Sequence, residues 1–241
     1  MINSSGRMGN RVGRAAESAG AYLATRKKLI QDHGFIEIAY SAIMGRLARF
    51  GFHLFLVELG DDSPGIAFPE LDPGYTARAA DLEELWPWVG KDYGLSEDFL
   101  RGAIARGDHC VANFFNGELV GYGFVTKVGA PVTDQLEVVI DDRLIYRYKG
   151  WTHPDHRRKH LSHARGRLNR QFFPLTDGRR TVDYVAVHNL ASKLKHPDIH
   201  PVRLGYCGFV RLFGCEYPFT QRVPRRFGFR LARRHRGGDI P

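Results

Sequence analysis

Hydrophobic and polar positions follow two different periods near the start of the chain, and each period predicts an element. Residues 36–49 carry apolar side chains at roughly helical spacing, which predicts an amphipathic helix. Its apolar positions are Ile36, Ala39, Tyr40, Ile43, Met44 and Leu47. Residues 51–59, GFHLFLVEL, are typical of a strand. Acids, serine, proline and glycine interrupt the pattern after it, so residues 60–73 are expected to form a linker.

From Tyr75 onward the pattern alternates between strands and helices. YTARA, which begins at Tyr75, has the length of a short strand, and Asp81 is placed to cap a helix after it. Ser96 is placed to cap a second helix, EDFLRGAIAR. Glu97 and Asp98 suit the positive end of that helix. The elements of this part of the chain are therefore of mixed α and β type.

A hairpin is predicted in the middle of the chain. Residues 109–115 and 118–127 are typical of strands, and they flank the dipeptide Asn116-Gly117. Both turn residues tolerate positive φ, which a tight hairpin requires. A further strand is expected at residues 136–140.

An aromatic-rich strand is followed by a predicted helix. RLIYRYKGWT, residues 143–152, is expected to be a central strand. Four apolar residues after it are spaced 3, 4 and 4 positions apart: Leu161, Ala164, Leu168 and Phe172. They form one stripe, so residues 159–172 are expected to form a helix packed on the sheet. The remaining expected elements are a strand at 181–187, a short helix from Asn189, and aromatic segments near 206–213 and 226–231 that complete the sheet.

Composition allows a sizeable core and argues against several protein classes. The chain has 241 residues, of which 43% are apolar and 12% aromatic. No apolar run is long enough to cross a bilayer, and the first residues lack the apolar segment of a secretory signal. Cys110, Cys207 and Cys215 do not form a disulfide framework, so a reducing cytoplasm is the expected location.

The positive charge lies mostly at the two ends of the chain. Of the net charge of +9, residues 1–35 contribute +4 and residues 201–241 contribute +7, which leaves the middle near −2. A basic chain suggests nucleic acid, but charge confined to the ends also suits anionic lipid or an acidic carrier protein. Nucleic acid is not the expected partner.

The stretch THPDHRRKHLSHARGRL, residues 152–168, carries the strongest chemical signal. It lies where a strand ends and a helix begins, and it concentrates three cations: Arg157, Arg158 and Lys159. A helix start leaves amide N–H groups without intrahelical partners and carries a positive partial charge, so it can hold an anion. We interpret the stretch as a diphosphate site.

The same stretch raises a metal alternative. His153, His156, His160 and His163 are spaced 3, 4 and 3 apart, and histidine is a common metal ligand. The adjacent cations would repel a metal ion, and only Asp155 adds a nearby acidic ligand, so no metal is expected. Nucleic-acid binding would require exposed aromatic residues. The nearby aromatics alternate as strand residues and are expected in the core or against a cofactor: Tyr146, Tyr148 and Trp151.

The sequence resembles the GNAT superfamily of acyl-CoA-dependent N-acyltransferases over residues 74–214. In that family a central strand is followed by a loop Gln/Arg-x-x-Gly-x-Gly/Ala, whose amides bind the CoA pyrophosphate at a helix start. WTHPDHRRKHLS matches this pattern with Arg157-x-x-His160-x-Ser162. Four further segments match in order: YTARAADLEEL, GELVGYGFV, VHNLAS and RLGYCGFVRLFG.

The resemblance implies a fold and a chain organisation. The expected class is α/β (α+β), with a mixed, mostly antiparallel central sheet flanked by helices. Residues 1–73 would be an N-terminal tail and helix–strand extension, 74–215 the acyltransferase domain, and 216–241 a basic C-terminal strand and tail. The extension has three open roles: it covers the acceptor cleft, extends the sheet or mediates dimerisation.

The resemblance also implies a reaction, in which an amine attacks the thioester of acetyl-CoA or another acyl-CoA, the co-substrate, in one ternary complex. The expected cofactor-binding residues are Trp151, Thr152, His153, Arg157, Arg158, Lys159, His160, Leu161, Ser162, Asn189 and Ser192. Glu137 and His188 are candidates for the base that takes the amine proton, and Tyr206 for the acid that protonates the thiolate. Backbone N–H groups at the end of strand 143–152 are expected to bind the thioester carbonyl.

The sequence departs from the family pattern at two places. His160 replaces the loop glycine, and Pro197 and Pro201 interrupt the usual last helix, where many members supply a tyrosine acid. Three alternatives therefore stay open. The donor is an acyl carrier protein docked on the Arg-rich segment 222–236, or the domain binds acyl-CoA without catalysis, or the basic ends contact a membrane surface. The acceptor is a small-molecule or protein amine, and a homodimer is an open option.

Overall fold

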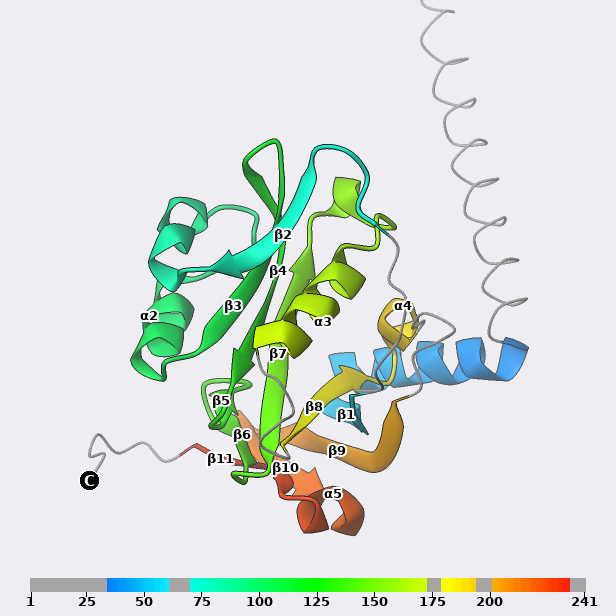
Figure 1. The fold of residues 1–241 in the computed structure, drawn as a ribbon. Helices are drawn as coiled ribbons and strands as arrows, with labels where there is room; N and C mark the ends of the chain where they lie inside the picture. The colour runs from blue at the N-terminus through cyan, green and yellow to red at the C-terminus, as the bar shows by residue number, and fades with distance from the viewer. Residues whose placement is uncertain (1–33, 61–69, 173–178, 194–200, 235–241) are drawn as a thin grey trace, which may run out of the picture.

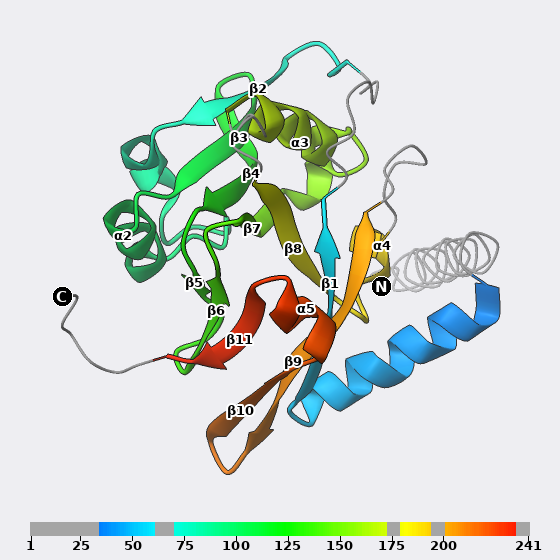
Figure 2. The same ribbon diagram turned by 60° about the horizontal axis from the view of Figure 1, so that its bottom comes forward.

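The computed structural model describes residues 34–60, 70–172, 179–193 and 201–234. An eight-stranded sheet has the order β10-β9-β1-β8-β7-β4-β3-β2, and a three-stranded sheet has the order β11-β6-β5 (Figures 1 and 2). The strands of the large sheet are β1 (Phe52–Leu59), β2 (Tyr75–Ala80), β3 (His109–Phe115), β4 (Glu118–Thr126), β7 (Leu144–Thr152), β8 (Arg180–Ala186), β9 (Val202–Leu212) and β10 (Cys215–Thr220). All neighbouring strands pair antiparallel except β7 and β8. The predicted class, a mostly antiparallel mixed sheet flanked by helices, is confirmed.

Helices and the small sheet cover the large sheet on both faces. The helical elements are a helix over residues 34–49, η1 (Leu82–Trp88), α2 (Glu97–Ala105), η2 (Pro154–His156), α3 (Leu161–Phe172), α4 (Leu190–Lys193) and α5 (Arg222–Arg226). Helix α3 packs over β2, β3, β4 and β7. On the opposite face, η1 and α2 form a core with Tyr122 and Phe124. No helix in the described ranges is long and apolar enough to cross a membrane.

Local sequence signals account for several element boundaries. Asn116 and Gly117 have φ angles of 49° and 89°, which confirms the predicted hairpin turn between β3 and β4. The Ser96 hydroxyl accepts a hydrogen bond from Phe99 N–H and caps α2. Asp81 caps the predicted helix, η1, which is a 3₁₀ helix that contains Pro87. A proline inside a helix removes one backbone donor, which favours the shorter form.

The small sheet departs from the sequence expectation. Its strands are β5 (Ala130–Pro131), β6 (Leu136–Ile140) and β11 (Phe229–Arg233). The segment 226–231 was expected to complete the main sheet, but it forms the end of α5 and most of β11, which pairs with β6 instead. Apolar residues from both sheets form one core, including Val57, Val138, Tyr146 and Phe229.

Strand β1 lies inside the large sheet. It pairs antiparallel with β8, where Leu56 lies opposite Val185, and with β9, where Leu56 lies opposite Tyr206. The segment before residue 74 therefore contributes an interior strand, one of the three roles that the sequence leaves open. Most of the expected linker, residues 61–69, lies outside the described residues.

The predicted helix is present over residues 34–49, and most of its apolar stripe faces away from the sheet. Met44 is the only residue of the predicted apolar stripe that is buried, in a cluster with Leu56 and Val187. Ser41 is buried beside it, and its hydroxyl donates to the His188 carbonyl at 2.8 Å. Ser41 and Met44 thus face the sheet, and the other apolar residues of the stripe do not. A helical pattern identifies an apolar face but does not say which face the tertiary structure covers.

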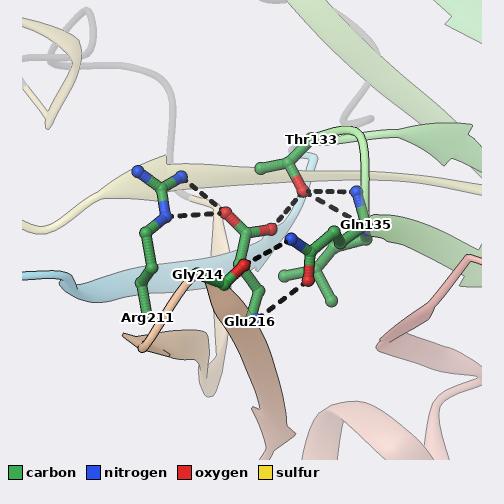
Figure 3. Close-up of polar contacts among 6 residues, drawn as sticks. Thr133, Gln135, Arg211, Gly214 and Glu216 are labelled. Atoms are coloured by element: carbon green, nitrogen blue, oxygen red, sulfur yellow. Dashed lines mark hydrogen bonds and ion pairs between the residues drawn. The ribbon is translucent and has the colours of Figure 1, made fainter.

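A polar cluster around the buried Glu216 joins the turn before β6 to the β9–β10 hairpin (Figure 3). Glu216 accepts hydrogen bonds from the Thr133 hydroxyl and from Arg211, whose Nε lies 3.0 Å from Oε1. Gln135 donates to the Gly214 carbonyl at 2.7 Å and accepts from Glu216 N–H at 3.0 Å. Because a buried carboxylate requires partners for both oxygens, these contacts fix the hairpin against the small sheet.

Replacing Glu216 with Gln is expected to lower the free energy of unfolding at neutral pH by about 1–3 kcal/mol, because Arg211 loses its charged partner. Burial alone would raise the pKa of Glu216, but hydrogen bonds from Thr133 and Arg211 bring it below its ordinary value of 4.5. A lowered carboxyl pKa stabilises the fold above pH 4.5, and this contribution is lost as the pH falls through the folded-state pKa.

Urea unfolding measured from neutral pH to below pH 4.5 tests the prediction. The stability gap between wild type and E216Q should shrink on acidification. E118Q, at the exposed start of β4, should leave stability nearly unchanged. A difference in unfolding free energy between wild type and E216Q that stays constant with pH would contradict the lowered pKa of Glu216.

Candidate active site

The candidate site lies where two parallel strands separate. Strands β7 and β8 pair only at Leu144–Arg180, Ile145–Thr181 and Tyr146–Val182, and then diverge (Figure 1). Because the strands are parallel, the segments that follow them, η2 with α3 and α4, lie at the same end of the sheet. Beyond Tyr146, the edge of β7 that faces β8 has no strand partner within the described residues. This edge is free to pair with an extended ligand.

A row of charged residues crosses the sheet at the point of divergence. It consists of Arg147 on β7, Asp183 on β8, Glu58 on β1 and Arg203 on β9, and we call it the vertex row. Arg147 Nη2 lies 2.5 Å from Asp183 Oδ2, Glu58 lies opposite Asp183 in register, and Arg203 Nε lies 3.8 Å from Glu58 Oε1. Glu58 is buried.

The vertex row replaces backbone pairing as the link between β7 and β8. The Arg147–Asp183 ion pair is partly buried and follows directly after the last backbone pair of the two strands, so it fixes where they separate. Sequence reasoning missed these residues. Their signal is an isolated charge inside an apolar strand, as in LFLVEL and TVDYVAV.

A β-bulge lies in β7 beyond the vertex row. Tyr122 of β4 pairs with Trp151 and Phe124 pairs with Tyr148, so β7 contains one more residue than β4 between these pairs. Lys149, within this interval, has a φ of 53°. A bulge interrupts the ladder and re-aims backbone groups. Backbone N–H groups at Lys149 and Gly150 are therefore candidates to bind a carbonyl oxygen, at the part of β7 expected from sequence.

The loop before α3 contains two residues in the left-handed region. Arg158 has a φ of 66° and His160 a φ of 55°. The His160 carbonyl accepts the first helical bonds, from His163 N–H at 3.0 Å and Ala164 N–H at 3.1 Å. The N–H groups of Leu161 and Ser162 precede these bonds and form the open end of the helix.

The cations of this loop differ in their surroundings. Lys159 Nζ lies 2.8 Å from Asp72 Oδ2, and hydrogen bonding to Lys159 lowers the pKa of Asp72. Arg157 Nε lies 3.5 Å from the Thr152 carbonyl, and both Arg157 and Arg158 are exposed. The two arginines are thus the cations with side chains in solvent beside the helix start, while Lys159 is held by an exposed ion pair.

A buried arginine connects α3 to the end of β7. Arg165 is 7% exposed, and it donates to Asn113 Oδ1 at 2.5 Å and to Thr152 Oγ1 at 3.3 Å. Burial lowers the pKa of Arg165 to about 10, so the side chain remains charged at neutral pH. A Cβ at Gly121 would lie 2.7 Å from Arg165 Nη1, so the glycine provides room for this guanidinium.

The four histidines of the stretch do not converge. His156 Nδ1 lies 2.8 Å from the Tyr75 hydroxyl, and its ring packs on Phe115. His153 Nδ1 accepts from Asp155 N–H at 3.3 Å and caps η2. His160 and His163 lie together, with ring centroids 5.5 Å apart. Within the described residues, no group of three or more histidine, cysteine or acidic side chains is placed to hold a metal ion.

The other expected cofactor-binding residues fall into two groups. Trp151 stacks on Tyr122 with centroids 5.5 Å apart and belongs to the core on the α2 face. Asn189 and Ser192 lie after β8, and Asn189 Oδ1 accepts from Ser192 N–H at 3.2 Å, which caps α4 as expected from sequence. They lie at the same end of the sheet as η2.

The three residues expected to be catalytic lie in different places. Glu137 is on β6, and alternation along the strand directs it away from the core that contains Leu136 and Val138. Tyr206 is on β9, which β1 separates from β8 by a full strand. His188 follows the end of β8 and is exposed, with its backbone held by Ser41. His188 is therefore the one of the three that lies at the open end of the diverging pair.

Comparisons with known proteins give weak similarity. No family model matches the sequence, and a search of curated proteins finds no match. Among solved structures, the chain is similar to a GCN5-related N-acetyltransferase from Kribbella flavida (16% identity, TM-score 0.43, 67% of this chain and 61% of that chain). It is also similar to a tandem GNAT protein from the clavulanic acid biosynthesis pathway (15%, 0.40, 70% and 56%) and to a GCN5-related N-acetyltransferase-like protein from Streptococcus suis 89/1591 (13%, 0.38, 70% and 65%).

The chain spans less than two thirds of the length of each of these three structures. Their sequence identities and TM-scores are low.

Replacing His160 with Gly is expected to stabilise the protein by about 0.5–1 kcal/mol. A left-handed conformation costs a residue with a Cβ about 1–2 kcal/mol, and the greater freedom of glycine in the unfolded chain returns part of that gain. R167G, at an exposed position inside α3, should instead destabilise by about 1 kcal/mol. Chemical denaturation of both variants measures the difference. If H160G lowered the free energy of unfolding as much as R167G does, the His160 side chain would be shown to stabilise the loop.

Proposed function

We propose that the protein is an N-acyltransferase that transfers an acetyl or other acyl group from acyl-CoA to an amine. One observation carries the proposal: β7 and β8 diverge beside a bulge in β7, and the cationic start of α3 follows at the same end of the sheet. The sequence resemblance to GNAT acyltransferases in the loop before α3 supports the same reaction.

The open edge of β7 suits the arm of an acyl-CoA. Residues Arg147–Thr152 run past the vertex row without pairing to β8. A CoA arm contains amide groups, and an extended amide chain can pair with a free strand edge as another strand would. An acyl-CoA paired along this edge would have its thioester near the vertex row and its nucleotide near the start of α3.

The start of α3 suits the diphosphate. The free N–H groups at Leu161 and Ser162 and the helix dipole favour an anion there. Arg157 and Arg158 would add charge-assisted contacts, because both side chains are exposed beside this end. Arg165 would act indirectly, by fixing Thr152 and therefore the end of β7 relative to the helix.

The chemistry requires a neutral amine to attack the thioester carbon. A C–N bond forms and the C–S bond breaks, negative charge passes from the carbonyl oxygen to the sulfur, and the amine loses a proton. In the bulge, N–H groups at Lys149 and Gly150 would stabilise the oxygen. His188 would take the amine proton, since it lies at the end of β8 where an acceptor can enter. The departing thiolate is protonated from solvent in this scheme.

A second candidate, an acyl-CoA-binding domain without catalysis, is favoured by the placement of Glu137 and Tyr206. Neither residue lies at the diverging pair, and His160 occupies a left-handed position where the related loops have glycine. A carrier-protein donor is less well supported. Its expected docking segment includes α5, which lies toward the opposite end of the sheet from η2 (Figure 1).

Replacing Arg157 and Arg158 together with Ala is expected to weaken CoA binding at least tenfold, with a smaller salt dependence, because two diphosphate contacts are lost. Calorimetric titration with CoA at two salt concentrations measures this change. R101A/R230A removes the same charge from α2 and β11 and should bind as wild type. Equal affinities in the two double variants would overturn the diphosphate assignment.

Thiol release from acetyl-CoA, measured with and without a panel of primary amines, separates catalysis from binding. Amine-dependent release that falls at least tenfold in H188Q, with CoA affinity unchanged, is the expected result for catalysis. Binding of CoA without release for any amine would instead support the non-catalytic domain. Release that is unaffected in H188Q would remove His188 as the base.

A further inference from the structure

The helix over residues 34–49 has a second apolar face that points into solvent. The face that packs against the sheet is narrow: its buried residues are Ser41 and Met44. The outer face carries larger side chains, and the backbone bond from Phe50 N–H to the Leu47 carbonyl extends the helical geometry by one residue. Exposed apolar residues on this face are Ile36 (84% exposed), Tyr40 (36%), Ile43 (57%), Leu47 (40%) and Phe50 (82%). We call these five residues the helix seam.

The spacing of the helix seam is that of a coiled coil. Successive members are 4, 3, 4 and 3 positions apart, which is the alternation of a and d positions in a heptad. A heptad forms a narrow stripe along one line of the helix, which another helix can cover by knobs-into-holes packing. A flat surface such as a lipid bilayer places no such requirement on the spacing, and typically contacts a wider apolar face. The pattern therefore indicates a helical partner.

We propose that the helix seam binds the helix seam of a second copy, across a twofold axis. A second copy supplies a helix of equal length and equal apolar character, as a self-complementary interface requires. Other long helices described in the chain do not offer such a face to a partner. Leu100 and Ala103 of α2, and Leu161 and Ala164 of α3, are buried within their own subunit.

The exposed area is sufficient for a dimer. The five exposed fractions together equal about three fully exposed side chains. At roughly 200 Å² for each, the two copies would bury roughly 1,200 Å², which is at the lower end of stable specific interfaces. On each copy this is roughly 600 Å², at the upper end of the largest apolar patch on a typical monomer.

The charges beside the helix seam do not oppose self-association. Between residues 34 and 50, the charged residues are Glu37, Arg46 and Arg49, and none of them is a seam position. Association driven by the apolar seam should depend only weakly on salt. Binding to anionic lipid would instead weaken with salt, because it would rely on Arg46 and Arg49.

Sedimentation velocity over a range of micromolar concentrations tests the proposal on the full chain. Wild type should form a dimer whose dissociation constant changes little between low and high salt. Ile43→Lys and Ile43→Glu should each raise that constant at least tenfold, because either charge would be buried at the centre of the helix seam. Val128→Lys and Val128→Glu are matched controls at a half-exposed apolar residue outside the seam, and they should leave the dimer unchanged. Circular dichroism and thermal unfolding should show that all four variants remain folded.

Three outcomes would overturn the proposal. The first is a wild-type protein that remains monomeric over the whole range. The second is a dimer that both Ile43 variants retain. The third is a monomer that binds vesicles of phosphatidylserine and phosphatidylcholine, with binding lost in Ile43→Glu and kept in Ile43→Lys, which would assign the seam to a lipid surface.

Discussion

The early end of the parallel pairing between β7 and β8 determines where everything else in the site can lie. Three residues pair, and then an ion pair between Arg147 and Asp183 takes the place of the next backbone bonds. Beyond it, β7 has an open edge, a bulge and a helix start in sequence, all made from one continuous stretch of chain. A longer ladder between the two strands would close this edge, because each backbone group would already have a partner.

Strand β1 changes the surroundings of that open edge. It lies between β8 and β9, so it supplies Glu58 to the vertex row and moves β9 one strand further away. Adjacent strands lie about 4.8 Å apart, so with β1 between them the strand β9, which carries Tyr206, lies roughly 10 Å from β8. The same segment brings the helix over residues 34–49 against His188 through Ser41. The segment before residue 74 is therefore part of the sheet and borders the candidate site.

Sequence reasoning succeeded where the cause of structure is local. The Asn116-Gly117 turn, the Ser96 and Asn189 caps, the strand 136–140 and the strand-to-helix transition at 152–161 all depend on neighbouring residues, and all are present. It failed where the cause is a partner far along the chain. Nothing near Leu56 indicates that Val185 and Tyr206 pair with it, and nothing near Glu137 indicates that β11 draws its strand into a separate sheet. The vertex row depends on three strand pairings: β7 with β8, β8 with β1 and β1 with β9. Its residues are visible in the sequence as isolated charges within strands, but the sequence does not show that they lie in one row.

The position of β1 also bears on how the chain folds. Leu56 pairs with Val185 and Tyr206, which follow it much later in the chain. During synthesis, β1 therefore cannot form its backbone hydrogen bonds with β8 and β9 until most of the protein has been made. During that interval FHLFLVEL is an apolar strand with both edges unpaired, the kind of segment that associates with other chains. Glu58 is the acidic residue of this segment, and Arg203, whose Nε lies 3.8 Å from Glu58 Oε1 in the folded protein, follows much later in the chain. An acidic residue within an apolar strand disfavours association with other chains, so Glu58 would also oppose aggregation before the sheet is complete.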